Sequence, residues 1–301
     1  MPSNSVIQCY DIGGTNLRAA IISGGEFLIP PEVVASKKGD VDELLLQVER
    51  LSHVQRKKAS ITAVDAVVLA VPGPVAQGYL LNSPPLDLTE AVHLPSRLSS
   101  VFEERNLIVG NDLAIAAYGE ISRGLLGDNQ GDFCLVSIST GIGVALARNH
   151  MVIPGNFEIG HIIVEFDEVK AQQCLNHRGC WASHVAGFGL SMMLRKENIQ
   201  LDLPEFFASD VSQQFMPRLK EYNARGFAQL INAYDPQVIL VTGSLGLKQF
   251  EKIIPEKDEI SKYCLFDKIP PIVKSTLGEY GGLWGAYYYG LSWLREKNVD
   301  C

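Results

Sequence analysis

Hydrophobic positions along the 301-residue chain form short continuous runs, and these alternate with longer segments whose apolar side chains recur at helical spacing. The runs at 6–10 and 66–71 are typical of strands buried on both faces of a sheet. Residues 42–58 place apolar side chains on one face and basic ones at the end, which predicts an amphipathic helix. The alternation of buried strands and amphipathic helices predicts an α/β fold.

The first apolar run ends in a glycine turn. Residues 6–10 lead into Asp11-Ile12-Gly13-Gly14-Thr15-Asn16, and a second apolar run follows at 17–22, which predicts strand, turn and strand. Glycines let main-chain N–H groups approach a ligand, and with the Thr15 hydroxyl such a turn suits phosphate oxygens. Asp11 at the strand end is suited to orient Mg²⁺ through water. Taken alone, an ordinary hairpin turn explains the pattern equally well.

A second stretch repeats this arrangement. The apolar run at 133–138 leads into Ser139-Thr140-Gly141-Ile142-Gly143, and an apolar run follows at 144–147. Two copies of strand, Thr/Gly turn and strand predict a duplicated module with two phosphate-binding turns.

Further elements follow from the same patterns. Strands are predicted at 27–29, 107–109, 162–164 and 238–241, and helices at 113–120, at 210–234 and from 281 onward. Pro217 and residues 223–226 are expected to kink or interrupt the helix at 210–234. The strand at 238–241 ends in a third glycine turn, which contains Gly243 and Ser244.

Composition narrows the classes of function. A hydrophobic content of 47% supports well-formed cores, and a net charge of −8 gives no basic footprint, so no nucleic-acid partner is expected. No apolar run approaches the roughly 20 residues of a membrane span, so no membrane association is expected. The first residues lack the charged and apolar regions of a signal peptide, which predicts a cytoplasmic location.

Three motifs together resemble the ROK family of sugar kinases, within the actin/hexokinase-like ATPase superfamily. They are the turn that begins at Asp11, the turn 139–143 and Glu158-Ile159-Gly160-His161, and the resemblance covers essentially the whole chain. It implies a two-domain actin-like ATPase (ribonuclease H-like) fold, with a duplicated mixed sheet flanked by helices and an interdomain cleft. The expected domains are 1–115 together with a final helix at about 279–301, and 116–278. Because the first motif starts so early, no helix-turn-helix domain is expected before it.

The resemblance implies transfer of the γ-phosphate of ATP, with Mg²⁺, to the 6-hydroxyl of a hexose. Asp112 would then be the catalytic base and Asn111 would hold sugar hydroxyls. On the residues alone, an N-cap of the helix that follows is the favoured explanation of Asp112, and only the family resemblance reverses this preference. A donor other than ATP, such as ADP or polyphosphate, stays open.

The remaining site residues are implied by the same resemblance. The expected ATP- and phosphate-binding residues are Asp11, Gly13, Gly14, Thr15, Asn16, Thr140, Gly141, Gly143, Gly243 and Ser244. The expected sugar-binding residues are Gly73, Asn82, Ser83, Asn111, Asp112, Glu158 and His161. Two positions depart from the family pattern: Asn16 replaces a lysine seen in many relatives, and Pro85 stands where relatives have an asparagine.

The zinc motif of the family is also altered. Relatives follow the histidine that matches His161 with Cys-x-Cys-Gly-x-x-Gly-Cys-x-Glu, whereas this chain has Cys174, His177 and Cys180 at a different spacing. A substitute site for structural zinc, formed by His161, Cys174, His177 and Cys180, would supply four N/S ligands. The alternative is a zinc-free loop packed by Trp181.

Ala182 stands where relatives have a sugar-binding glutamate. The sugar pocket therefore either makes fewer hydrogen bonds near C1 and C2 or has room for a bulkier C2 group such as N-acetyl. Glucose and N-acetylhexosamines, notably N-acetylmannosamine, compete as substrates. A non-catalytic sugar-binding regulator of the same fold is the alternative function, and the family resemblance implies a homodimer.

Overall fold

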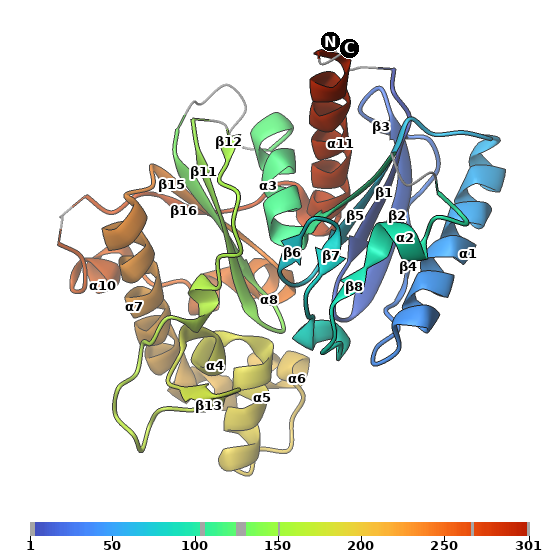
Figure 1. The fold of residues 1–301 in the computed structure, drawn as a ribbon. Coiled ribbons are helices and arrows are strands. Elements are labelled where there is room, and N and C mark those ends of the chain that lie inside the picture. Colours follow the sequence, from blue (N-terminus) through green and yellow to red (C-terminus); the bar gives the residue numbers. More distant parts are fainter. Residues whose placement is uncertain (1–3, 103–105, 125–130, 150, 266–267, 300–301) are drawn as a thin grey trace. The chain divides into compact units, whose positions relative to one another are not determined.

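The computed structural model describes residues 4–102, 106–124, 131–149, 151–265 and 268–299 (Figure 1). The chain divides into two compact units. The first comprises Met1–Asp128, Pro154–Asn156 and Glu279–Cys301, and the second comprises Asn129–Ile153 and Phe157–Gly278. This division keeps helix α3 (Asp112–Ser122) whole within the first unit, whereas the predicted boundary after residue 115 would cut it.

The first unit is built on a six-stranded mixed sheet in the order β3-β2-β1-β5-β9, with β4 also paired to β2. Its strands are β1 (Ile7–Ile12), β2 (Asn16–Ser23), β3 (Glu26–Phe27), β4 (Glu32–Ala35), β5 (Ala66–Val71) and β9 (Leu107–Asn111). The β1–β2 hairpin is antiparallel, whereas β1, β5 and β9 run parallel. Parallel strands end at the same edge, so the loops after β1, β5 and β9 lie together.

Helices cover both faces of this sheet (Figure 1). Helix α1 (Val41–Ala59) packs on one face, starts at the Asp40 N-cap and ends at Ser60 in the left-handed conformation. Helix α3 packs against α11 (Gly281–Val299), which also contacts β1 and β5. The smaller elements are β6 (Val75–Ala76), β7 (Tyr79–Leu80), η1 (Pro84–Leu86), β8 (Val92–His93), α2 (Leu94–Arg97) and η5 (Gly278–Tyr280).

The second unit repeats the arrangement with a five-stranded sheet in the order β12-β11-β10-β15-β16. Its strands are β10 (Phe133–Ile138), β11 (Ile142–Arg148), β12 (Met151–Val152), β15 (Val238–Thr242) and β16 (Ile272–Lys274). As in the first sheet, an antiparallel hairpin, β10–β11, pairs through its first strand with a parallel strand, β15. The predicted duplication of a mixed sheet is thus confirmed.

Helices of different lengths, two 3-10 turns and one small hairpin make up most of the rest of the second unit. They are η3 (Ile159–His161), the hairpin β13 (Gln173–Cys174) and β14 (His177–Arg178), α4 (Trp181–Val185), α5 (Gly187–Lys196), α6 (Leu203–Ala208), η4 (Asp210–Phe215), α7 (Met216–Tyr234), α8 (Ser244–Lys248), α9 (Phe250–Ile253) and α10 (Lys257–Ser261). The fully buried Trp181, Phe206 and Phe227 belong to one core cluster of this unit.

Two local predictions are wrong. Residues 162–164 form no strand, because their main chain pairs with a short turn: Val164 N–H donates to the Gly179 carbonyl and Trp181 N–H to the Ile162 carbonyl. The helix predicted at 210–234 begins as 3-10 helix, and Pro217 lies in the first turn of α7, where its missing N–H costs nothing. Helix α7 continues through residues 223–226, and Gly226 serves packing, because a Cβ there would lie 2.3 Å from the Trp181 ring.

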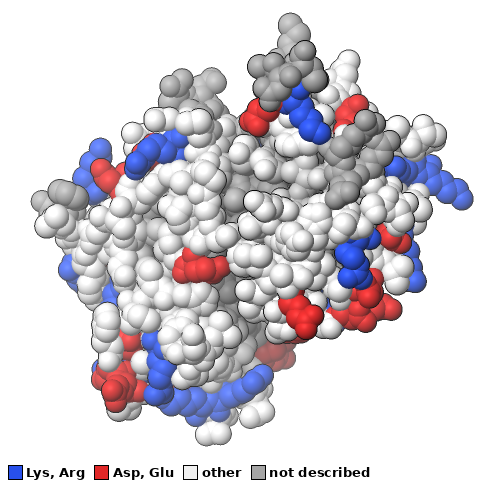
Figure 2. Space-filling view, in the orientation of Figure 1, with Lys and Arg blue, Asp and Glu red and all other residues white. Residues whose placement is uncertain are grey.

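Figure 2 shows Lys and Arg side chains in separate small groups, most of them beside Asp or Glu. This distribution, with a net charge of −8, gives the face shown no extended basic surface among the residues described. Within the described part of the chain, no helix combines the length and apolar character needed to cross a bilayer.

Candidate functional site

The first glycine turn is held from two sides within the first unit. Gly13 N–H donates to the Asn16 carbonyl at 2.9 Å, and the Ser36 hydroxyl donates to the Gly13 carbonyl at 2.6 Å. A Cβ on Gly14 would lie 2.8 Å from Pro85 Cβ and 2.9 Å from its carbonyl oxygen. Only glycine therefore allows the 3-10 turn that contains Pro85 to pack on the phosphate-type turn.

Asp11 lies beside this turn with 17% of its side chain exposed. Arg18, its partner in the hairpin register, approaches its Oδ2 through Nη1 at 3.5 Å. The first turn of α11 lies against the same carboxylate, since a Cβ on Gly282 would be 2.5 Å from Asp11 Cγ. Burial raises the pKa of the Asp11 carboxyl, and the charge and hydrogen bond of Arg18 act in the opposite direction.

Strand register brings the predicted groups of the first unit to one edge of its sheet. Asp11 pairs with Ala70 across β1 and β5, and Ala70 pairs with Gly110 across β5 and β9. Because neighbouring strands lie about 4.8 Å apart, Asp11 and Gly110 are separated by roughly 10 Å. Asp112 begins two residues after Gly110, at the N-terminus of α3.

The N-cap of α3 is Asn111 and not Asp112. The Asn111 Oδ1 accepts hydrogen bonds from Leu113 N and Ala114 N at 3.1 and 3.0 Å, and its Nδ2 donates to the Gly73 carbonyl at 3.1 Å. Asp112 occupies the first helical position, is half-buried, and accepts from Leu113 N through Oδ1. The capping alternative for Asp112 is thus wrong, and the Asn111 amide is engaged in positioning the loop after β5.

The loop after β5 is rigid for identifiable reasons. Gly73 has a φ of +133°, and a Cβ there would lie 2.3 Å from the Asn82 carbonyl oxygen. Ser83 is fully buried and its hydroxyl donates to the Pro72 carbonyl at 2.5 Å. The expectation that Ser83 contacts sugar is therefore corrected: its side chain holds the loop in place. Asn82 is exposed.

The second unit brings its two predicted glycine turns together. The Ser139 and Ser244 hydroxyls lie 3.1 Å apart, and Gly243, with a φ of +83°, would place a Cβ 2.5 Å from the Ile138 carbonyl oxygen. The N-terminus of α5 supports the turn that contains Thr140 and Gly141, since Gly187 N–H and Phe188 N–H donate to the carbonyls of Ser139 and Thr140.

The Glu158–His161 motif packs on the same turn. Gly160 lies so close to β11 that a Cβ would be 2.0 Å from the Ile142 carbonyl oxygen. Glu158 is exposed, and its Oε2 lies 4.0 Å from His161 Nε2. Within the second unit, this motif therefore neighbours the predicted phosphate-binding residues at 140–143.

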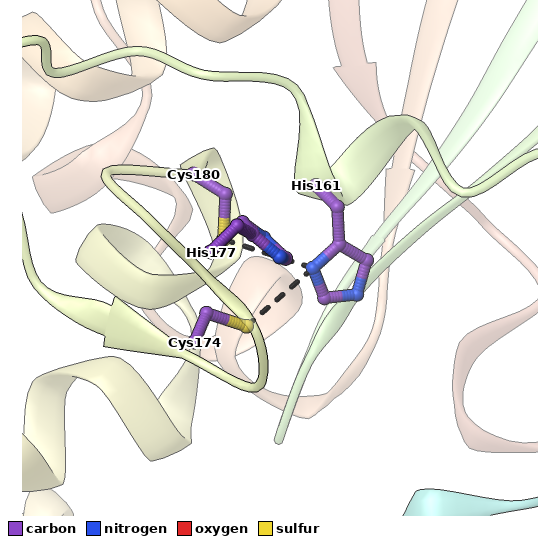
Figure 3. Close-up of side chains that lie close together, drawn as sticks. All are labelled: His161, Cys174, His177 and Cys180. Atoms are coloured by element: carbon purple, nitrogen blue, oxygen red, sulfur yellow. Dashed lines mark hydrogen bonds between the residues drawn. The ribbon is translucent and has the colours of Figure 1, made fainter.

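The other nitrogen of His161 faces a cluster of potential metal ligands (Figure 3). Its Nδ1 lies 3.5 Å from Cys174 Sγ and 3.7 Å from Cys180 Sγ. His177 completes the group, and one ligand atom from each of the four residues lies within 4.8 Å of the others. The structure thus brings together all four residues that the sequence analysis proposed.

Two distances in the cluster match the ligand spacing of a tetrahedral zinc site. Zn–S bonds of about 2.3 Å and Zn–N bonds of about 2.0–2.1 Å place neighbouring S and N ligands roughly 3.6 Å apart. The two distances from His161 Nδ1 match this spacing. His177 Nε2 is buried, and His177 is one of the groups that lower the pKa of the Cys180 thiol, so its imidazole acts on the same sulfur as His161 does.

The electrostatics of the cluster favour a thiolate. Burial would raise the pKa of the Cys180 thiol, but hydrogen bonds from His161 and Ser183 outweigh it and lower that pKa to about 6. The hydrogen bond with Cys180 likewise raises the pKa of His161. Burial raises the pKa of Cys174 to about 12. A cation between the sulfurs would stabilise both thiolates and so offset the free-energy cost of ionising the buried Cys174 thiol.

Ala182, in the position of the family's sugar-binding glutamate, is 1% exposed and belongs to the core of the second unit. The methyl group of Ala182 therefore packs in this core and offers no hydrogen-bond acceptor at the position of that carboxylate.

Three residues near the turns were missed by sequence reasoning. Arg18 faces Asp11 across the hairpin, and the register of a tight hairpin was a signal that could have found it. Ser36 and Gly282 approach the first turn and Asp11 from segments far along the chain, and no local pattern marks them.

Comparison with known proteins agrees with these features. Residues 7–291 match the model of the ROK family. The chain is 25% identical over 303 residues to an N-acetylmannosamine kinase of Haemophilus influenzae, covering 96% of this chain and 95% of that protein.

Solved structures show the same fold. A ROK family glucokinase from Streptomyces griseus, in complex with glucose and AMPPNP, superposes with a TM-score of 0.75 at 19% identity, over 95% of this chain and 99% of that one. A ROK family transcriptional regulator, described as a homologue of the Escherichia coli MLC protein, gives a TM-score of 0.79 at 19% identity, over 96% and 79%. The duplicated mixed sheets are those of the actin-like ATPase fold, and this chain belongs to the ROK family.

Proposed function

We propose that this protein is a sugar kinase that transfers the γ-phosphate of ATP, with Mg²⁺, to the 6-hydroxyl of a hexose. The observation that carries the proposal is the position of the Asp112 carboxylate. Asn111 caps α3, so the Asp112 carboxylate is not required as a cap and stands at the sheet edge that also bears Asp11. A carboxylate there is suited to accept the proton of the acceptor hydroxyl.

The remaining predicted site residues would bind the phosphates, Mg²⁺ and the sugar. The turn at 13–16 and the turns at 140–143 and 243–244 would hold the phosphates and nucleotide, and Asp11 would orient Mg²⁺. Asn82, Glu158, His161 and the main chain at Gly73 would hold the sugar. When bound, Mg²⁺ neutralises phosphate charge, which matters because Asn16 replaces a lysine of many relatives.

N-Acetylmannosamine is the first candidate acceptor, because curated relatives that match 96% of the chain are named N-acetylmannosamine kinase. Glucose is the competing acceptor, since a structure of this fold was solved with glucose and AMPPNP. An assay that couples ADP release to a spectroscopic signal, run over a panel of hexoses and N-acetylhexosamines, tests both.

The decisive variant is Asp112→Asn. It should lower kcat about 10²–10⁴-fold, the usual contribution of a general base, while the melting temperature changes little, because Asn111 is the cap and the introduced amide oxygen can still accept from Leu113 N. Wild-type turnover that survives this substitution would refute the assignment of Asp112. The matched control is Asp87→Asn, which changes a carboxylate outside the sheet edge.

A sugar-binding regulator without catalysis is the second candidate, supported by the similarity to the ROK family transcriptional regulator. Sugar binding in calorimetry, together with no ADP release over the whole panel, would favour it over the kinase. The expected homodimer is a separate proposal, tested by light scattering on the purified protein.

We also assign the cluster of His161, Cys174, His177 and Cys180 to zinc. Two thiolates and two imidazoles give a neutral site with Zn²⁺, and bound zinc would cross-link the β13–β14 hairpin to His161. Metal analysis of purified protein should find one zinc per chain, and Cys180→Ser should lower that content.

A further inference from the structure

The two cysteines of the cluster form a pair of sulfurs in reach of each other. Both face the same nitrogen, His161 Nδ1, and both sulfurs belong to the set of ligand atoms that lie within 4.8 Å of one another (Figure 3). Both thiols are free. The other described cysteines, Cys9, Cys134 and Cys264, lie outside the cluster.

The two sulfurs are held by different means. Cys180 is anchored: it pairs with Ile163, its Sγ accepts from Ser183 N at 3.4 Å, and it is fully buried. Cys174 lies in the β13–β14 hairpin, whose strands are two residues long and whose turn contains Leu175, which is 72% exposed. Cys174 itself is buried, but its hairpin is held by two residue pairs, Gln173 with Arg178 and Cys174 with His177, so a small movement of its sulfur disturbs little main-chain pairing.

We propose that Cys174 and Cys180 form an oxidisable pair: a peroxide converts them to a disulfide, and the loss of both thiolates expels the metal. This inference rests on the zinc site proposed above and not on the kinase activity. A disulfide needs about 2.05 Å between sulfurs, so from 4.8 Å each would move at most about 1.4 Å, within reach of a χ1 rotation.

The oxidation is a balanced two-electron step. The Cys180 thiolate attacks one oxygen of hydrogen peroxide, so an S–O bond forms, the O–O bond breaks, and hydroxide leaves and takes up a proton to become water. The Cys174 thiolate then attacks the sulfenic sulfur, so the S–S bond forms, the S–O bond breaks, and the second oxygen leaves as hydroxide, which takes up one proton to become water. In total, two thiolates, one peroxide and two protons give one disulfide and two waters.

Oxidation of this pair should affect the predicted sugar site, because His161 borders both the two sulfurs and Glu158. His161 Nδ1 faces the sulfurs, while its Nε2 lies 4.0 Å from the Glu158 carboxylate. With the metal and both thiolates lost, the ring loses the groups that hold its orientation and protonation state. Sugar affinity should therefore fall upon oxidation.

The test uses zinc-loaded full-length protein with the substitutions Cys264→Ser and Cys301→Ser, so that fewer thiols compete. One equivalent of hydrogen peroxide is added, and released zinc is measured with a chromogenic chelator. Trypsin cleaves after Lys170 and Arg178, so the two cysteines fall in separate peptides, 171–178 and 179–195, and their disulfide appears as a linked pair. We expect one zinc released per linked pair, with both changes reversed by dithiothreitol and added zinc.

Two results would overturn the inference: a peroxide-treated protein without the linked pair, or one that keeps its zinc after the pair has formed. Cys174→Ser should give no linked pair, and if this variant fails to fold, the wild-type peptide map still decides. Protein that never takes up zinc overturns the metal site and this inference together. Turnover on the sugar panel, measured separately in reduced protein, tests the kinase proposal on its own.

Discussion

The contact between helix α11 and Asp11 gives a sharp test of how Mg²⁺ would be positioned. A Cβ on Gly282 would lie 2.5 Å from Asp11 Cγ and 2.7 and 2.8 Å from its two carboxylate oxygens. Ordinary van der Waals contacts of a Cβ begin at 3.4 Å, so Gly282→Ala must displace the carboxylate by at least the difference from 2.5 Å, about 0.9 Å.

The magnitude follows from this displacement. Misplacing a group that orients reactants by about 1 Å costs roughly 100-fold in rate, so kcat of the Gly282→Ala variant should fall by about that factor. The fold should tolerate the change, because alanine is favoured over glycine within a helix by about 1 kcal/mol, which offsets part of the steric cost. The measurements are kcat in the ADP-release assay and the thermal unfolding midpoint.

Gly290→Ala is the matched control, since it lies in the same helix and would place a Cβ 2.8 Å from the flexible end of the Ile7 side chain. Overpacking should lower the free energy of unfolding of this variant by up to about 3 kcal/mol, and its kcat should stay unchanged. If Gly282→Ala turns over within about threefold of wild type, the reasoning about Asp11 is refuted.

Three further predictions concern stability. Asn111→Ala should lower the free energy of unfolding by about 1 kcal/mol through the lost N-cap, and an unchanged urea midpoint would contradict this. Burial, aided by the charge of Arg218, lowers the pKa of His184 to about 4. As the pH falls below about 6.5, the unfolded chain therefore binds a proton at His184 before the folded chain does. The contribution of neutral His184 to the free energy of unfolding is full above pH 6.5 and falls by up to about 3 kcal/mol as the pH drops toward 4. In urea titrations, His184→Phe should flatten this dependence, and an unchanged slope would argue against it. Gly226→Ala should cost about 1–3 kcal/mol, since its Cβ would overlap the Trp181 ring beside Cys180; an unchanged melting temperature and zinc content would contradict that packing.

Much of the fold could be predicted because its signals are local. The hairpins β1–β2 and β10–β11 follow from apolar runs joined by glycine turns, and helix α1 follows from one apolar face and a basic end. The metal cluster was also partly predictable. Cys174, His177 and Cys180 recur every third residue in one loop, and their ligand atoms converge.

Other features depended on contacts that no local pattern records. The strand predicted at 162–164 did not form, because the 179–181 segment takes up hydrogen bonds of its main chain, and the same pairing with Cys180 helps bring His161 to the sulfurs. The family resemblance implied that Ser83 binds sugar, yet its hydroxyl is buried and donates to the Pro72 carbonyl.

Neighbouring residues were sufficient to predict the α/β class, the two glycine hairpins and the grouping of Cys174, His177 and Cys180, because backbone freedom, apolar periodicity and side-chain chemistry are local properties. Tertiary contacts were needed to establish that Asn111 and not Asp112 caps α3, and that Asp11 lies between Arg18 and Gly282. The reason is that hydrogen-bond competition and steric fit are settled by which segments meet, and Asp11 meets a helix that lies at the far end of the chain.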